Sequence, residues 1–308
     1  MTSVRVGLAL GGGAARGLSH LGVIRALRRA EIPIDAVAGA SMGALVGALF
    51  CARGDIEQVL ADAVRFMGSE EFEKARIHRL RRGVIESDLG VRAAMSRYLT
   101  RGRVLASTVA RPSVLSADDL YELLEFFIDD QEIRTFRIPF RAVAVDISTG
   151  EEVVFRSGSA IDVVAASSAV PGAFPPIKVE DRECIDGGTT NMVPVSVARE
   201  MDVDYVIASN VSHELPVPRD SMRALEVYFH THRITKLALL KHLLKDADMV
   251  ITPKVGHIHW ADFSRREEII EAGAQAAEPA IERIRDDLKR LARIPKFLRR
   301  RKESLRAD

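Results

Sequence analysis

The sequence predicts an α/β fold in which helices cover both faces of a mostly parallel central sheet. Two alternations near the N-terminus carry this prediction. An apolar run at 4–10 leads through glycines into a helical pattern at 18–30, and a second apolar run around Val37 leads into a helix-forming run at 44–51. Strand and helix patterns continue to alternate later in the chain. Such β–α repeats are typical of layered domains in which helices connect parallel strands.

Composition limits the classes of protein to consider. The chain has 308 residues, 47% of them hydrophobic, and a formal net charge of +1, so no whole-chain field favours nucleic acid. Cys51 and Cys184 are too few for a disulfide framework. The first residues lack the pattern of a signal peptide, and no apolar stretch approaches the ~18 residues of a membrane span. We therefore expect one domain at 4–292 in a cytoplasmic protein.

The elements are expected in the following order. Val4–Leu10 is apolar enough for a buried strand, and Pro33 ends the helix that follows it. Thr149 and Gly150 predict a hairpin turn between two strands. Further helices are expected at 55–66, 89–99, 117–129, 160–168, 219–245 and 265–291, and further strands at 140–147, 152–155, 203–209, 248–252 and up to Asp186.

The segment at 68–135 differs from its surroundings. Its strand signals are weak and basic residues cluster in it, which predicts a helical insertion on the sheet. The insertion is either a cap over the site or an ordinary solvated helical layer. The basic residues are Arg76, Arg79, Arg81, Arg82, Arg97, Arg101 and Arg103.

The stretch Gly39-Ala40-Ser41-Met42-Gly43 lies between a predicted strand and a predicted helix. This is the context in which Gly-x-Ser-x-Gly forms a nucleophile elbow, with the serine on a strained turn. Small flanking residues let strand and helix approach closely, and the helix N-terminus stabilises developing negative charge. A simple turn rich in small residues remains the alternative.

A glycine run, Gly11-Gly12-Gly13, follows the first strand. The dinucleotide fingerprint is not met, because Ala14 and Arg16 interrupt it, and the Gly-Lys-Ser/Thr of a P-loop is missing. An oxyanion hole made of backbone N–H groups remains. If the first two strands are neighbours, this loop meets the elbow at one sheet edge. Arg16 either adds positive charge there or makes a structural salt bridge.

Asp186 is the expected base for Ser41. Burial beside the serine would raise its pKa and a direct hydrogen bond would position it. An Asp-Gly turn is the alternative. A Ser–Asp–His triad ending at His257 or His259 is a further alternative. In α/β-hydrolases, however, the serine follows several strands, whereas Ser41 follows only two predicted strands. The pairs His230/His232 and His257/His259 lack further ligands at metal spacing.

Taken together, these motifs resemble those of bacterial patatin-like phospholipases, in the branch related to the catalytic domain of neuropathy target esterase. The matching stretches are 11–17, 39–43, 166–171, 186–188, 191–195, 251–253 and 257–273. The resemblance covers most of residues 4–275. The segments at 68–135 and beyond 292 lie outside it.

The resemblance implies a three-layer patatin-like fold and a Ser41–Asp186 dyad that works without histidine. It also implies a glycine-loop oxyanion hole, a phospholipid or lysophospholipid substrate, and no metal or organic cofactor. Many members have glycine where this chain has Ala14, which still offers its N–H. The implied oxyanion-hole residues are Gly11, Gly12, Gly13 and Ala14, and the supporting residues are Arg16, Gly17, Gly39, Gly43, Gly187 and Gly188. The alternatives are a non-catalytic regulatory or adaptor module, a thioesterase and a peptidase.

The C-terminal stretch is basic, with apolar residues interleaved, and includes Arg299-Arg300-Arg301-Lys302. It predicts either a peripheral anchor on anionic lipid or a solvated tail at 293–308. The sequence does not predict the oligomeric state.

Overall fold

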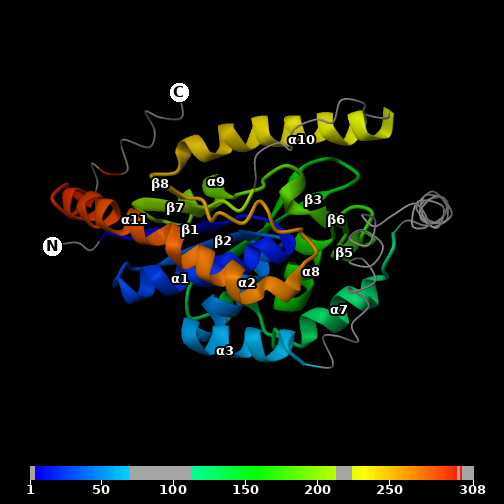
Figure 1. Cartoon of the computed structure of the whole chain (residues 1–308), viewed down its shortest axis with the longest axis horizontal. Helices are drawn as coiled ribbons and strands as arrows, with labels where there is room; N and C mark the ends of the chain where they lie inside the picture. Colours follow the sequence, from blue (N-terminus) through cyan, green and yellow to red (C-terminus); the bar gives the residue numbers. More distant parts are fainter. Residues whose placement is uncertain (1–3, 70–112, 213–223, 297–298, 300–308) are drawn as a thin grey trace.

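The computed structural model describes residues 4–69, 113–212, 224–296 and 299 (Figure 1). The helix expected at 89–99 and the arginine cluster of the insertion lie outside the described residues. So does the basic run at 300–302. The predicted insertion is therefore described only up to Ser69 and from Ser113 onward.

The helices and strands alternate as the sequence predicts. The strands are β1 (Val6–Leu10), β2 (Ala36–Ala40), β3 (Phe140–Asp146), β4 (Glu152–Phe155), β5 (Ile177–Val179), β6 (Arg182–Asp186), β7 (Tyr205–Ser209) and β8 (Met249–Ile251). The helices are α1 (Ser19–Arg29), α2 (Met42–Arg53), α3 (Ile56–Met67), α7 (Ala117–Glu125), α8 (Ala160–Ser168), α9 (Val195–Arg199), α10 (Ala224–Leu243) and α11 (Arg266–Ala292). Short 3₁₀ turns are η1 (Ala14–Leu18), η3 (Ile133–Thr135), η4 (Gly187–Thr189), η5 (Leu244–Asp246) and η6 (Phe263–Arg265).

In the described part of the chain, the strands form one eight-stranded sheet in the order β5-β6-β3-β2-β1-β7-β8, with β4 pairing to β3 off this path. The five strands from β3 to β8 along this order are parallel, whereas β4, β5 and β6 are antiparallel to their neighbours. The mostly parallel α/β sheet is thus confirmed.

The sheet has helices on both faces (Figure 1). Alternation along β1 divides the core, because successive side chains of a strand point to opposite faces. Leu8 and Leu10 belong to the larger apolar cluster, which contains side chains of α1, α2, α3, α8 and α11. Ala9 belongs to a second cluster on the other face, with side chains of α9 and Leu240 of α10. Small residues on this second face let α9 lie close to the sheet.

Register brings three segments to one edge of the sheet. Leu10 pairs with Gly39 across the parallel β1–β2 ladder, so the glycine run and the elbow leave the sheet side by side. Ala40 pairs with Val143 of β3, and Ala144 pairs with Asp186 of β6. Only β3 therefore lies between β6, which ends at Asp186, and β2, which leads into the turn of Ser41.

Besides the 3₁₀ turns, the sequence does not predict the short elements β5 and α9, of three and five residues. Neither is long enough to show a hydrophobic period. The helix expected at 117–129 ends at Glu125, and the one expected at 18–30 begins with the 3₁₀ turn η1. Among the described residues, no helix is both long enough and apolar enough to cross a bilayer.

The ends of the described chain meet at Asp204. Its Oδ2 accepts hydrogen bonds from the backbone N of Arg5 at 2.9 Å and from a guanidinium nitrogen of Arg299 at 3.1 Å. The Arg299 and Asp204 side chains are only 2% and 5% exposed. Arg299, the first residue of the basic run at 299–302, thus makes a buried ion pair with the rest of the domain.

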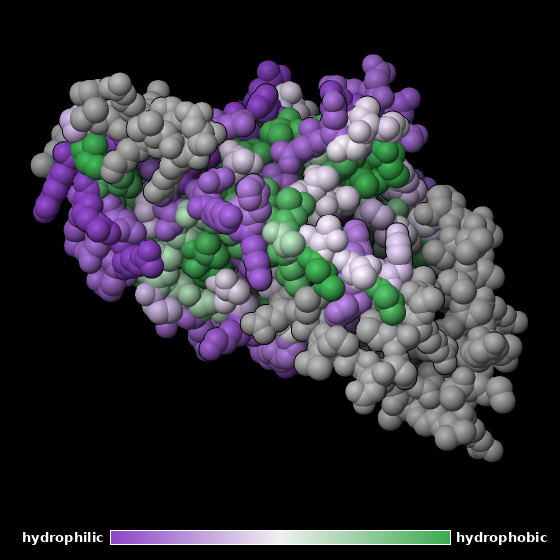
Figure 2. Space-filling model, turned by 90° about the horizontal axis from the view of Figure 1, so that it is seen from above, coloured by the Kyte–Doolittle hydropathy of each residue, from purple (hydrophilic) through white to green (hydrophobic). Residues whose placement is uncertain are grey.

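The outer surface of α10 is unusual for a surface helix. Val227, Tyr228, Ile234 and Leu239 are between 38% and 66% exposed. Figure 2 views the molecule from the α10 side and shows hydrophobic residues scattered among hydrophilic ones.

Candidate active site

Ser41 occupies the turn between β2 and α2 in a strained backbone conformation. Its φ is 54° and its ψ is −124°, and positive φ is uncommon for a residue with a side chain. Such a conformation costs of the order of 1–3 kcal/mol and persists only where the surroundings enforce it. The Ser41 carbonyl oxygen accepts hydrogen bonds from the N–H groups of Ala44 and Leu45, which begins α2.

Close packing of the backbone enforces this turn. A Cβ added to Gly43 would lie 2.2 Å from the carbonyl oxygen of Leu10, and one added to Gly39 would lie 2.5 Å from that of Gly43. No larger residue fits at either position without moving β1, β2 or α2. These contacts give the physical reason for the two glycines that flank the serine.

The end of α8 supports both residues of the expected dyad. The backbone N–H of Ser41 donates to the Ser167 hydroxyl oxygen at 3.0 Å, and that hydroxyl donates to the carbonyl oxygen of Val143 at 2.7 Å. Ser167 is fully buried. Two residues later, the carbonyl oxygen of Ala169 accepts from the backbone N of Asp186 at 2.9 Å. Ser167 lies in the stretch 166–171 that the sequence singles out, but the sequence predicts no role for it, because only the tertiary fold brings it to Ser41.

Asp186 ends β6 and faces Ser41. The Gly188 N–H donates to its Oδ1 at 2.7 Å, and the Ser41 side chain lies close enough to the carboxylate to lower its pKa. Ser41 and Asp186 are each only 7% exposed. Burial raises the pKa of Asp186, while the bonds from Ser41 and Gly188 and the charge of Lys236 oppose that rise. The neighbouring Gly187 packs against β3, where an added Cβ would lie 2.2 Å from the Val143 carbonyl oxygen.

The glycine run lies directly against the serine. A Cβ on Gly12 would lie 3.2 Å from the Cβ of Ser41. The Gly11 N–H already donates to the carbonyl oxygen of Ser209 at 3.1 Å, and the Gly12 N–H donates to that of Met192 at 2.9 Å. Within the described residues, no backbone partner is recorded for the N–H groups of Gly13 and Ala14. The two glycines nearest the strand therefore anchor the loop.

The His20 ring connects this loop to the end of β7 through two hydrogen bonds. It is fully buried; its Nδ1 lies 2.8 Å from the Ser209 hydroxyl and its Nε2 lies 2.7 Å from the Gly11 carbonyl oxygen. A carbonyl oxygen only accepts, so Nε2 carries the proton and Nδ1 accepts from Ser209. Burial lowers the pKa of His20 to about 4, although the bond to Gly11 opposes this. No sequence pattern predicts this role for His20.

Arg16 and Gly17 connect the loop to its neighbours. The Arg16 Nε donates to the carbonyl oxygen of Ile258 at 2.7 Å, so the arginine ties η1 to the loop before α11. Burial and the nearby charge of Arg233 lower the pKa of Arg16. A Cβ on Gly17 would lie 2.5 Å from the Cγ of Met42, the residue after the serine.

Lys236 of α10 is a second residue without a sequence signal. It is partly buried, and its charge interacts with that of Asp186. Burial lowers its pKa and Asp186 raises it. In the sequence it is one of several basic residues in a long helical pattern, and nothing distinguishes it from a solvated lysine.

The histidines near the C-terminus do not complete a triad. His257 Nε2 lies 3.0 Å from Glu268 Oε1, and His259 Nδ1 accepts from the backbone N of Ala261 at 3.2 Å. Neither is among the groups that interact with Asp186. Across the described ranges, no cluster of three or more potential metal ligands is found.

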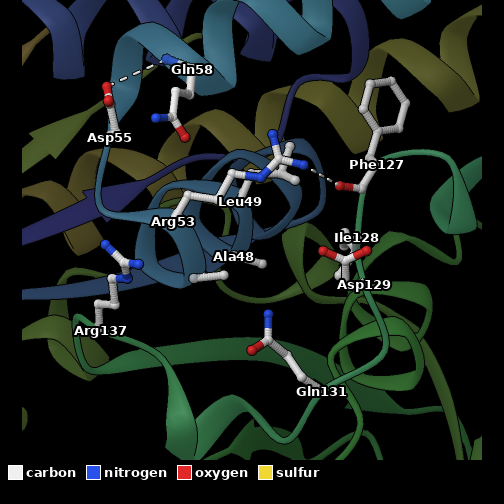
Figure 3. A pocket seen from close by; sticks show the side chains of 11 residues that line it. Ala48, Leu49, Arg53, Asp55, Gln58, Phe127, Ile128, Asp129, Gln131 and Arg137 are labelled. Atoms are coloured by element: carbon white, nitrogen blue, oxygen red, sulfur yellow. Dashed lines mark hydrogen bonds between the residues drawn. The ribbon is translucent and has the colours of Figure 1, made fainter.

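A pocket of about 330 Å³ lies at the opposite end of α2 from Ser41 (Figure 3). Leu49, Arg53, Asp55 and Arg137 are among the residues that line it, and Arg53 donates to the carbonyl oxygen of Phe127. Leu49 is eight residues after Ser41, about 12 Å along a helix. This pocket is therefore separate from the Ser41 site.

The chain is similar to several known proteins. The patatin-like phospholipase family matches residues 8–199. An uncharacterised NTE family protein of Mycobacterium tuberculosis is 29% identical over 214 residues, covering 68% of this chain and 50% of that protein. Lysophospholipase NTE1 of Pyricularia oryzae is 25% identical over 307 residues, covering 92% of this chain but 19% of that protein.

A patatin-like phospholipase domain-containing protein of Caenorhabditis elegans is 33% identical over 214 residues, covering 68% of this chain and 14% of that protein. The chain thus spans half or less of the length of these relatives. Among solved structures, VipD from Legionella pneumophila aligns with a TM-score of 0.42 and 13% identity, covering 91% of this chain and 67% of that one.

Proposed function

Because this chain belongs to the patatin-like phospholipase family, we propose that it hydrolyses carboxylic esters of phospholipids or lysophospholipids through Ser41 and Asp186. The observation that carries the proposal is the strained, buried Ser41 beside the buried Asp186, whose pKa the Ser41 side chain lowers. A nucleophile held at a helix N-terminus against a positioned base is the arrangement that acyl transfer requires.

In the first half of the reaction, Ser41 Oγ attacks the ester carbonyl carbon while the Asp186 carboxylate accepts the hydroxyl proton. The carbonyl oxygen becomes an oxyanion. We assign its stabilisation to the N–H groups of Gly13 and Ala14 and to the N-terminus of α2, since Gly11 and Gly12 donate elsewhere. The C–O bond to the alcohol then breaks, and the alcohol leaves with the proton held by Asp186.

In the second half, water attacks the carbonyl carbon of the acyl-enzyme and gives its proton to Asp186. The bond between the acyl carbon and Ser41 Oγ breaks, and Ser41 recovers a proton from Asp186 as the fatty acid leaves. The raised pKa of Asp186 suits this role, because a base closer in pKa to the working pH transfers protons in both directions.

Fluorophosphonate labelling, alongside hydrolysis of a short-chain nitrophenyl ester, tests the proposal. We expect wild type to label and turn over, Ser41→Ala to do neither, and Asp186→Asn to lose turnover with its circular dichroism unchanged. Ser168→Ala and Asp181→Asn are matched controls, because Ser168 is adjacent to the supporting Ser167 and Asp181 is exposed. Full esterase activity in purified Ser41→Ala would refute the assignment of the nucleophile.

A further inference from the structure

A closed ring of hydrogen bonds holds Gly11 at the start of the glycine loop. The Gly11 N–H donates to the Ser209 carbonyl oxygen at 3.1 Å, and the Gly11 carbonyl oxygen accepts from His20 Nε2 at 2.7 Å. The Ser209 hydroxyl donates to His20 Nδ1 at 2.8 Å and closes the ring. His20 and Ser209 are both fully buried, where such bonds are stronger than in water. The backbone of Gly11 is therefore fixed at both of its polar groups.

The rest of the loop is anchored on either side of two backbone donors. The N–H groups of Gly12 and Ala15 each donate at 2.9 Å to carbonyl oxygens of distant segments. Between them, the N–H groups of Gly13 and Ala14 have no backbone acceptor in the part of the chain that the structure describes. Ala14 also has a positive φ of 47°, a strained conformation that persists only where its surroundings enforce it. The loop thus spends its other donors on its own support and leaves these two for a ligand.

The position of this loop matters because it lies beside the nucleophile. A Cβ added to Gly12 would lie 3.2 Å from the Cβ of Ser41. Oxyanion-hole donors act only when they are held about 2.7–3.1 Å from the developing oxyanion, so a small displacement of the loop weakens them. Among the described residues, His20 is the side chain that bonds to the backbone of 11–14.

We propose that His20 is a positioning residue for the oxyanion hole. By holding the Gly11 carbonyl oxygen, it orients the N–H groups of Gly13 and Ala14 toward the oxygen of the ester that Ser41 attacks. The inference rests on the ester hydrolysis proposed above, and it adds a residue that acts through the loop without touching the substrate.

Four single variants separate positioning from general stability. His20→Leu removes both bonds of the ring, whereas His20→Gln keeps one donor and one acceptor on its amide. Ser209→Ala removes only the partner of Nδ1. The control Tyr205→Phe removes a buried hydroxyl from the other end of β7, where it donates to Asp287 Oδ2 at 2.9 Å. The double variant His20→Leu/Ser209→Ala completes the set.

Each protein is assayed for kcat and KM on nitrophenyl butyrate and for inhibition by a trifluoromethyl ketone, which adds to Ser41 as a tetrahedral oxyanion. We expect His20→Leu to lower kcat about tenfold with little change in KM, a smaller loss than the roughly 10²–10³-fold caused by removing an oxyanion donor outright. Inhibition by the ketone should weaken by the same factor, because the ketone adduct carries the same oxyanion.

The other variants should follow the ring of bonds. His20→Gln should recover most of the activity, and Ser209→Ala should lower kcat about threefold, as expected for the loss of one hydrogen bond. The double variant should be no slower than His20→Leu, since both changes open the same ring. Tyr205→Phe should stay within about twofold of wild type in kcat and inhibition, because it is distant from the loop, even if it lowers the midpoint of urea unfolding.

Three results would overturn the positioning role: equal losses of kcat in His20→Leu and His20→Gln, a fall in kcat without weaker inhibition by the ketone, or the same losses in Tyr205→Phe. A shifted acidic midpoint in the pH profile of kcat/KM for His20→Leu would overturn it too, because His20 would then act through Asp186.

If wild type neither labels nor hydrolyses any ester, the ester hydrolysis fails by itself. The role of His20 is then judged from NMR spectra of protein labelled with nitrogen-15 glycine. His20→Leu must broaden or split the amide signals of Gly12 and Gly13, and Tyr205→Phe must leave them unchanged. Unaltered signals in His20→Leu would refute the positioning role.

Discussion

Replacing Ser167 by alanine removes the hydroxyl that holds the strained turn of Ser41. The structure gives this hydroxyl two bonds, from the Ser41 N–H at 3.0 Å and to the Val143 carbonyl oxygen at 2.7 Å, in a fully buried position. The variant leaves the Ser41 N–H without that partner, and a buried unsatisfied group costs about 1–3 kcal/mol. We therefore expect the free energy of unfolding to fall by about 2 kcal/mol.

The effect on activity follows from the strain at Ser41. Its positive φ costs of the order of 1–3 kcal/mol, and the bond to Ser167 is one of the contacts that offset this cost. A shift of about 1.4 kcal/mol toward a relaxed turn would reduce the competent population about tenfold. We expect kcat and the rate of fluorophosphonate labelling to fall by about this factor, with little change in KM.

Urea unfolding and labelling kinetics measure the two effects separately. Ser168→Ala is the matched control, since it makes the same chemical change one residue later at a partly exposed position. If Ser167→Ala unfolds and labels like Ser168→Ala, the hydrogen bond from Ser41 to Ser167 does not hold the elbow and the reasoning is wrong.

Four further predictions follow from the same structure. In the pH profile of kcat/KM, the midpoint of the acidic limb should lie above pH 3.8, because Asp186 must be ionised and burial raises its pKa. Lys236→Gln should move this midpoint to a still higher pH, because the charge of Lys236 lowers the pKa of Asp186. A shift of the midpoint to lower pH in this variant would contradict Asp186 as the base. The ring protons of His20 should titrate near pH 4 in NMR spectra, and since the unfolded pKa is about 6.5, His20 should lower the free energy of unfolding by about 3 kcal/mol as the pH falls from 6.5 to 4. Arg299→Ala should lower the free energy of unfolding in urea by about 3 kcal/mol, because it leaves the buried Asp204 carboxylate without its arginine. Arg293→Ala, at an exposed position, should change it very little. Deleting residues 300–308, which spares the Arg299 ion pair, should weaken sedimentation with phosphatidylglycerol vesicles if the tail is a peripheral anchor; unchanged binding would exclude that role.

The sequence predicts those parts of the site where close packing of the backbone requires a glycine. Gly39 and Gly43 sit where an added Cβ would collide with backbone atoms, and one on Gly12 would crowd the Cβ of Ser41 at 3.2 Å; this requirement is visible as glycine in the chain. Strand periodicity likewise locates the ends of β1, β2 and β6, where the candidate residues lie.

The remaining site residues depend on long-range contacts that leave no local pattern. Ser167 lies 126 residues from Ser41 in sequence, and His20 lies 189 residues from Ser209. The charge of Lys236 acts on Asp186 from α10, a helix whose Leu240 packs against the sheet. The engagement of the Gly11 and Gly12 N–H groups also follows from distant strands, which the glycine run alone does not predict.

Asp204 holds the first described strand and the last described residue together at the edge of the sheet away from Ser41. Any segment fused before Arg5 or after Arg299 would start from the same corner of the domain. Arg5 and Arg299 therefore both lie at the end of the strands away from Ser41.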